Sequence, residues 1–199
     1  MGKLYAELDD RLRKFIAQQP VFFVATAPDL GLDGSGGHVN VSPKGYQDTF
    51  AVLGPRTVAY LDLTGSGAET IAHVRQNGRI TIMFCSFSHE TKIVRLYGTG
   101  EVVLPGSARW AELTSHFPRA ADRVAELTNQ RAIIVVNLER IADSCGYAVP
   151  EMTLAGERGV LDRWAASKSA GELAGYRAEK NTVSIDGLPA LDAEPARSR

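Results

Sequence analysis

The sequence predicts a mostly β protein with peripheral helices (α+β), built as a closed or nearly closed antiparallel barrel with Greek-key connections. Three observations support this fold class. Short, apolar, β-rich segments dominate the first two-thirds of the chain. Most connections between them are short turns, and only two helical segments, at residues 68–77 and 107–127, interrupt them. A doubly wound parallel sheet would instead alternate its strands with helices.

The N-terminal segment reads as an amphipathic helix that ends before Pro20. Charged residues separate its apolar residues, which recur at helical spacing: Leu4, Leu8, Leu12, Phe15 and Ile16. Residues 21–27 are short, apolar and β-rich, which indicates a buried strand. Residues 28–37 contain four glycines and two aspartates, so we expect a loop there.

The middle of the chain alternates apolar segments with turn residues. Ser107 can cap a helix that runs to His116, and a second short helix is predicted at residues 120–127. The strands that this part of the sequence predicts are 39–43, 49–53, 57–63, 79–87, 93–104 and 131–138.

The character of the chain changes to helical at Gly156. We therefore divide it into a barrel domain of residues 1–155 and a helical extension of residues 156–199. A solvated extension is the simplest interpretation of a polar, proline-containing tail. Trp164, Tyr176 and Leu188 are too apolar for that, so we expect the extension to pack on another surface.

Composition excludes several classes of protein. Charged residues are 23% of the chain and the net charge is −1, which gives no electrostatic case for binding nucleic acid or an anionic membrane. No apolar run approaches the ~20 residues that span a bilayer. The N-terminus lacks the apolar core of a signal peptide, and the two cysteines are far apart, so we expect a cytoplasmic protein. The four histidines show no metal-type spacing, so we expect no metal site.

One stretch carries a candidate ligand site. The predicted strand 57–63 runs into Thr-Gly-Ser-Gly at residues 64–67 and then into the helix at 68–77. Free N–H groups at a helix N-terminus favour phosphate, and Lys44 on a nearby strand would supply a positive charge. The same residues also suit an ordinary turn with a helix cap. The spacing matches neither a Walker A loop nor a dinucleotide fingerprint.

A resemblance to a known family bears on this choice. The chain resembles the pyridoxamine 5'-phosphate oxidase-like family of FMN-binding split barrels, and within it is most similar to bacterial pyridoxamine 5'-phosphate oxidase-related proteins of unassigned substrate. The resemblance covers nearly the whole chain, and the order of the matching pieces makes it convincing. These pieces are residues 39–45, 60–65, 69–71, 77–80, 79–87, 95–98, 144–150, 180–181 and 184–189.

The resemblance implies a homodimer of six-stranded antiparallel Greek-key split barrels, with FMN in grooves between the subunits. The extension would then pack on the barrel or on the partner subunit. Val41, Ser42 and Pro43 would line the isoalloxazine ring, and Lys44 would lie near the ring or its phosphate. Tyr60, Leu61 and Asp62 would follow the ribityl chain. Ser66 and Thr70 would reach the phosphate.

The chain departs from the true oxidases of that family in two places. They carry Ser-Arg-Lys at the start of the helix, where this chain has Ala68, Glu69 and Thr70. Glu69 would repel a phosphate unless it points away, and Arg75 or Arg79 would have to compensate. The C-terminal tail also lacks the Arg-x-His pattern that grips the substrate phosphate, so we do not expect pyridoxamine phosphate to be the substrate.

The resemblance thus implies an FMN-dependent oxidoreductase that acts on an unidentified small molecule. Flavin carries the hydride step itself, so few catalytic side chains are needed, and none stands out in the sequence. Lys44 would stabilise the reduced ring or balance the phosphate charge. Two alternatives stay open: a deazaflavin-dependent reductase of the same fold, and a non-catalytic flavin-binding or sensing dimer.

Overall fold

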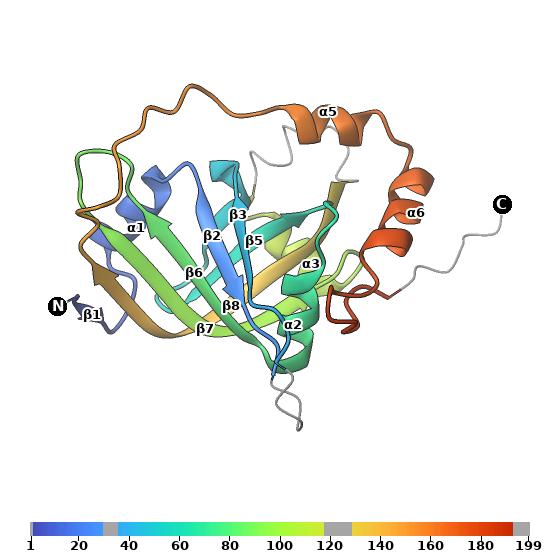
Figure 1. The fold of residues 1–199 in the computed structure, drawn as a ribbon, viewed down its shortest axis with the longest axis horizontal. Helices are drawn as coiled ribbons and strands as arrows, with labels where there is room; N and C mark the ends of the chain where they lie inside the picture. Colours follow the sequence, from blue (N-terminus) through green and yellow to red (C-terminus); the bar gives the residue numbers. More distant parts are fainter. Residues whose placement is uncertain (1, 30–35, 118–128, 193–199) are drawn as a thin grey trace.

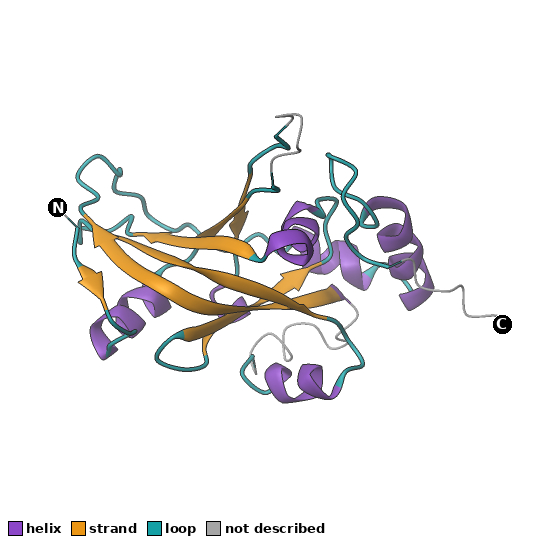
Figure 2. Ribbon diagram, turned by 90° about the horizontal axis from the view of Figure 1, so that it is seen from below, coloured by secondary structure: helices purple, strands orange, loops and turns teal. Residues whose placement is uncertain are grey.

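The computed structural model describes residues 2–29, 36–117 and 129–192. They form a curled antiparallel sheet, a half-barrel, with helices around it (Figures 1 and 2). The predicted fold class is therefore confirmed. The strands are β1 (Leu4–Tyr5), β2 (Phe22–Thr26), β3 (Asn40–Lys44), β4 (Phe50–Val52), β5 (Thr57–Leu63), β6 (Arg79–Cys85), β7 (Ile93–Val103) and β8 (Gln130–Ser144).

The strands follow one another in the sheet as β3-β2-β6-β7-β8-β5-β4, and β1 pairs with β8 outside this path. The expected count of six strands is therefore wrong: seven of the described strands form the path. β4 forms because a tight turn folds it back on β5, and the amides of Leu53 and Gly54 both donate to the Thr57 carbonyl, at 2.9 and 3.0 Å. Pairing of β2 with β6 and of β5 with β8 gives the predicted Greek-key connections.

Helices lie at the ends and on the outer side of the sheet (Figure 1). Their bounds are α1 Asp10–Gln18, η1 Gln47–Thr49, α2 Glu69–Asn77, α3 Ala108–Thr114, α5 Val160–Ala166 and α6 Ala170–Lys180. Ser107 caps α3 as predicted, because its hydroxyl accepts the Trp110 amide at 3.1 Å. The helix predicted at residues 120–127 lies outside the described residues. None of the described helices is both long and apolar enough to cross a membrane.

The first helix starts later than the sequence predicts. Asp9 caps it by accepting the Leu12 amide at 2.8 Å. Leu4–Tyr5 pairs with the end of β8 instead, and the Asp143 carboxylate accepts the Lys3 amide at 2.7 Å and the Tyr5 hydroxyl at 2.5 Å. The helical spacing of Leu4 and Leu8 is therefore coincidental, since strand pairing decides the structure of this segment.

Apolar side chains pack against both faces of the sheet. Tyr60 of β5 faces the inside of the curl, where the rings of Phe22, Phe50 and Phe84 also meet. The next residue, Leu61, belongs to a second cluster that includes residues of α3. Successive side chains of a strand point to opposite faces, so Asp62 faces the same side as Tyr60.

The C-terminal extension contacts the barrel of the same chain. In Figure 1 the segment after β8 runs along the molecule to α5 and α6, which lie at the opposite end from α1. The Arg177 guanidinium donates to the Thr64 hydroxyl at 3.0 Å, and Arg75 of α2 donates to the Ala190 carbonyl. The division of the chain at residue 155 stays a prediction.

Candidate functional site

A cavity of about 690 Å³ lies where β3 and β5 end. We call it the β3–β5 cavity. Chain segment 154–161, which leads into α5, forms its other wall. The volume is within the range of small-molecule sites. Its lining includes Pro43, Lys44, Leu61, Thr64, Gly65 and Leu161.

A buried charge cluster holds Lys44 in place at this cavity. Asp62 is fully buried, and each of its carboxylate oxygens binds one cation. The Lys44 ammonium lies 2.9 Å from Oδ1, and the Arg131 guanidinium nitrogen Nε lies 2.7 Å from Oδ2. Burial raises the pKa of Asp62, but the two cations outweigh that effect and lower the pKa to about 2. Asp62 is therefore ionised at neutral pH.

The three members of the cluster differ in exposure. The Lys44 side chain is 21% exposed and lines the cavity, whereas the Arg131 side chain is only 5% exposed. Arg131 also donates to the Gly65 carbonyl at 3.0 Å, which ties the cluster to the turn after β5. Burial, followed by the charge of Asp62, raises the pKa of Tyr60 well above its usual value, so its hydroxyl stays neutral. The cluster thus presents one accessible positive charge to the cavity.

The turn at residues 64–66 is fixed from both sides. The Thr64 hydroxyl donates to the Asn129 carbonyl at 2.9 Å and accepts from Arg177. The buried carboxamide of Asn181 donates to the carbonyls of Gly65 and Ser66, at 2.8 and 3.3 Å. α6 therefore brings Arg177 to the cavity wall, and the hydrogen bonds of Arg177 and Asn181 anchor the extension on the turn.

We expect Asn181→Ala to loosen the extension without unfolding the barrel. The substitution leaves the Ser66 carbonyl without its donor and the Gly65 carbonyl with Arg131 alone, which costs about 1–3 kcal/mol. Hydrogen exchange should become faster in α6 and stay unchanged in β8. Asn137→Ala, at an exposed position on β8, is the matched control. Equal protection of α6 in the two variants would contradict the anchoring role.

The structure brings only part of the predicted site together at the cavity. Pro43, Lys44 and Leu61 line the cavity, and the buried Asp62 holds Lys44 in place through their ion pair. Of the other residues assigned to the ring and ribityl chain, Val41 is 62% exposed on the edge strand, the Ser42 hydroxyl is buried with no hydrogen-bond partner among the described residues, and Tyr60 is fully buried.

The start of α2 lies outside the cavity lining. The Thr70 hydroxyl is buried and accepts from Asn40 at 3.0 Å, while the Ser66 carbonyl is bound by Asn181. The Glu69 carboxylate accepts the Ile185 amide at 3.3 Å, so it points toward the extension. The assignment of Ser66 and Thr70 to a phosphate stays a prediction.

Neither arginine that was considered as compensation for Glu69 lines the cavity. Arg75 binds Ala190 and Asp192, and Arg79 binds Asp29. Among the described residues, Lys44 and Arg158 line the cavity instead, and Arg131 and Arg177 lie behind its wall. The sequence shows Arg131 directly before an apolar strand but does not indicate that it belongs to the site. Its role depends on the pairing of β5 with β8, in which Asp62 lies opposite Ala132.

The comparisons with known proteins agree with this fold. The family model described as pyridoxamine 5'-phosphate oxidase matches residues 8–145. The pyridoxamine 5'-phosphate oxidase family protein ustO of Aspergillus flavus is 40% identical over 205 residues, which covers 96% of this chain and 78% of that protein.

Among solved structures, HupZ of Group A Streptococcus has a TM-score of 0.50 at 20% identity, covering 73% of this chain and 98% of its own. A variant of HupZ has a TM-score of 0.51 at 21% identity, covering 69% and 99%. At this identity the likeness shows the fold alone. The family match and the close relative together show that this chain belongs to the pyridoxamine 5'-phosphate oxidase family.

Proposed function

We propose that this protein binds FMN in the β3–β5 cavity and acts as a flavin-dependent oxidoreductase on a small molecule. The observation that carries the proposal is Lys44, an accessible cation fixed at the wall of a cavity of suitable volume by a buried carboxylate. Membership of the family supports it. Bound flavin would supply the hydride chemistry.

The residues present suit this cofactor. Pro43, Leu61 and Leu161 offer apolar surface to a flat ring. Lys44 would donate to the ring or to the phosphate, and Arg177, bound to Thr64 at the wall, adds positive charge. These two cations would replace the charge that the start of α2 lacks. Segment 154–161 would exclude water from the ring.

We also propose a homodimer with the cofactor at the subunit interface. Val39 and Val41 lie on or beside the edge strand β3 and are 70% and 62% exposed. An edge strand with exposed apolar side chains is normally covered by another chain. Sedimentation of the purified protein tests this part: a monomer at all concentrations would refute it.

The test of the cofactor is the visible absorption spectrum of freshly purified protein, with the heat-released chromophore identified by mass. We expect one FMN for each chain. A released deazaflavin would favour the first alternative. Flavin that NAD(P)H does not reduce, or that no substrate reoxidises, would favour a non-catalytic binding protein. Colourless protein that does not take up added FMN would refute the proposal.

We expect Lys44→Ala to weaken FMN binding about tenfold, because one charge-assisted hydrogen bond is lost. The measurement is the dissociation constant from fluorescence titration of flavin-stripped protein. Lys168→Ala removes a lysine outside the cavity lining and should leave the constant unchanged. An unchanged constant in Lys44→Ala would remove Lys44 from the site.

A further inference from the structure

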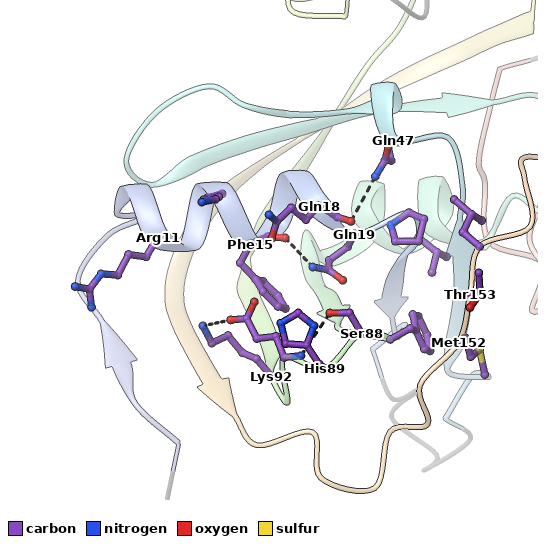
Figure 3. Close-up of a pocket in the computed structure, with 16 residues that line it drawn as sticks. Arg11, Phe15, Gln18, Gln19, Gln47, Ser88, His89, Lys92, Met152 and Thr153 are labelled. Atoms are coloured by element: carbon purple, nitrogen blue, oxygen red, sulfur yellow. Dashed lines mark hydrogen bonds and ion pairs between the residues drawn. The ribbon is translucent and has the colours of Figure 1, made fainter.

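A second cavity, of about 920 Å³, lies between α1, the turn that joins β6 to β7, and the segment around Met152 (Figure 3). We call it the α1 cavity. We propose that it binds a small organic anion with a flat apolar body, at a site separate from the flavin. This inference goes beyond the proposed function and does not depend on it.

The apolar part of the α1 cavity comes from three segments. Phe15 of α1 lines the cavity with a side chain that is only 2% exposed, and Met152 lies on the opposite side (Figure 3). Phe87, in the turn after β6, also lines it, and its carbonyl accepts the Met152 amide at 2.8 Å, which fixes the two segments together. Met152 is 61% exposed. A flat apolar body would cover this exposed thioether beside the Phe15 ring.

The charge of the α1 cavity is opposite to that of the whole chain. Arg11, Lys14 and Lys92 carry three positive charges, against one negative charge on Glu90, whereas the whole chain has a net charge of −1. Glu90 pairs with Lys92 at 2.7 Å, and the Lys92 ammonium lies 5.2 Å from the centre of the Phe15 ring. In the part of the chain that the structure describes, neither Arg11 nor Lys14 forms an ion pair.

This arrangement selects a ligand by charge and shape together. Lys92 lies beside the Phe15 ring, and Arg11 extends outward from α1 (Figure 3). A flat ring system on the apolar lining can therefore direct a carboxylate toward these cations. His89 stands in the same space and adds a ring nitrogen for a hydrogen bond (Figure 3). A neutral ligand of the same shape would gain only the apolar contact. The structure therefore favours an anion over its neutral analogue.

The two cavities are neighbours. Pro20, Val21 and Leu154 line both of them. On the side of η1, the Gln47 carboxamide donates to the Gln18 carbonyl at 3.4 Å, which connects α1 to the segment after β3 (Figure 3). A ligand in the α1 cavity would therefore sit next to the flavin without occupying its place.

The test compares two probes of equal size, 2-naphthoate and its neutral analogue naphthalene-2-carboxamide, by calorimetric titration of the full-length protein. We expect tighter binding of 2-naphthoate. The double substitution Arg11→Gln and Lys14→Gln should weaken its binding about tenfold and leave the carboxamide unaffected. Both residues are exposed, so the variant should fold. Lys168→Gln, which lies outside this cavity, should change neither affinity.

Saturation with FMN separates the two sites. The affinity for 2-naphthoate should not change when FMN is bound. Competition between the two ligands would overturn the inference, because the α1 cavity would then be part of the flavin site. Equal affinities for the two probes, or no binding of either, would also overturn it. Failure to bind FMN would refute the proposed function alone, since the probe titration does not use the flavin.

Discussion

Asp62→Asn is expected to lower the free energy of unfolding by about 3–5 kcal/mol, because it removes the carboxylate that two cations share. The Arg131 side chain is 5% exposed and cannot recover its lost partner by turning to water. Lys44 is partly exposed, so it would move toward the cavity. The variant should therefore lose stability and also misplace the cation that the proposed flavin site needs.

Urea unfolding, followed by circular dichroism, measures this effect. The matched control is Asp29→Asn, since Asp29 is 58% exposed and pairs with Arg79 at 3.3 Å on the surface. An exposed pair contributes about 0–1 kcal/mol. A loss in Asp62→Asn no larger than in Asp29→Asn would contradict the structural role of the cluster.

The same cluster predicts a pH dependence. The pKa of Asp62 is about 2 in the folded protein, below the usual value near 3.8 that the unfolded chain would show. A carboxylate with a lowered pKa stabilises the folded state above the unfolded pKa, and this contribution falls away as the pH drops toward the folded pKa. The difference in stability between the parent protein and Asp62→Asn should thus be constant near neutral pH and shrink by roughly 2 kcal/mol between about pH 4 and pH 2.

Local signals explain why most of the strands could be predicted. Strand β5 occupies the predicted residues 57–63, because a Gly-Pro turn precedes it and a Gly-rich turn follows it. β8 runs beyond its predicted end at residue 138. Glu139 and Arg140 end the continuous apolar run, but they are exposed positions of a strand whose next residue, Ile141, is buried again. The backbone pairing of β8 with β7 continues to Ser144, and it keeps this segment in a strand although the apolar run has ended.

The charge cluster could not be predicted for a different reason. Lys44 lies on β3, at one end of the strand order, and Asp62 lies on β5, next to the other end. Their contact at 2.9 Å exists only because the sheet curls and brings its two ends together. A single sequence shows neither this curl nor the register that adds Arg131. The sequence therefore assigns Lys44 and Asp62 separately to a cofactor and gives no sign that they bind each other.

Gly98→Ala is expected to be the most destabilising alanine substitution at a glycine of β7, with a loss of at least about 3 kcal/mol. The register of β7 with β8 shifts between Tyr97 and Gly98. A Cβ at residue 98 would lie 2.1 Å from the Asn137 carbonyl oxygen and 2.9 Å from its carbon. These are backbone atoms of β8, which has a strand on each side, so they cannot turn aside as a side chain could.

Gly100→Ala on the same strand is the matched control. The nearest atoms to a Cβ there would be in the side chains of Val74 and Ile80, at 3.2 and 3.3 Å, which can move by the small amount needed. Urea midpoints should therefore fall much further in Gly98→Ala than in Gly100→Ala. Equal midpoints would show that β8 yields easily at Asn137. The expected difference would mean that the glycine of segment 95–98 is needed for the register of β7 with β8.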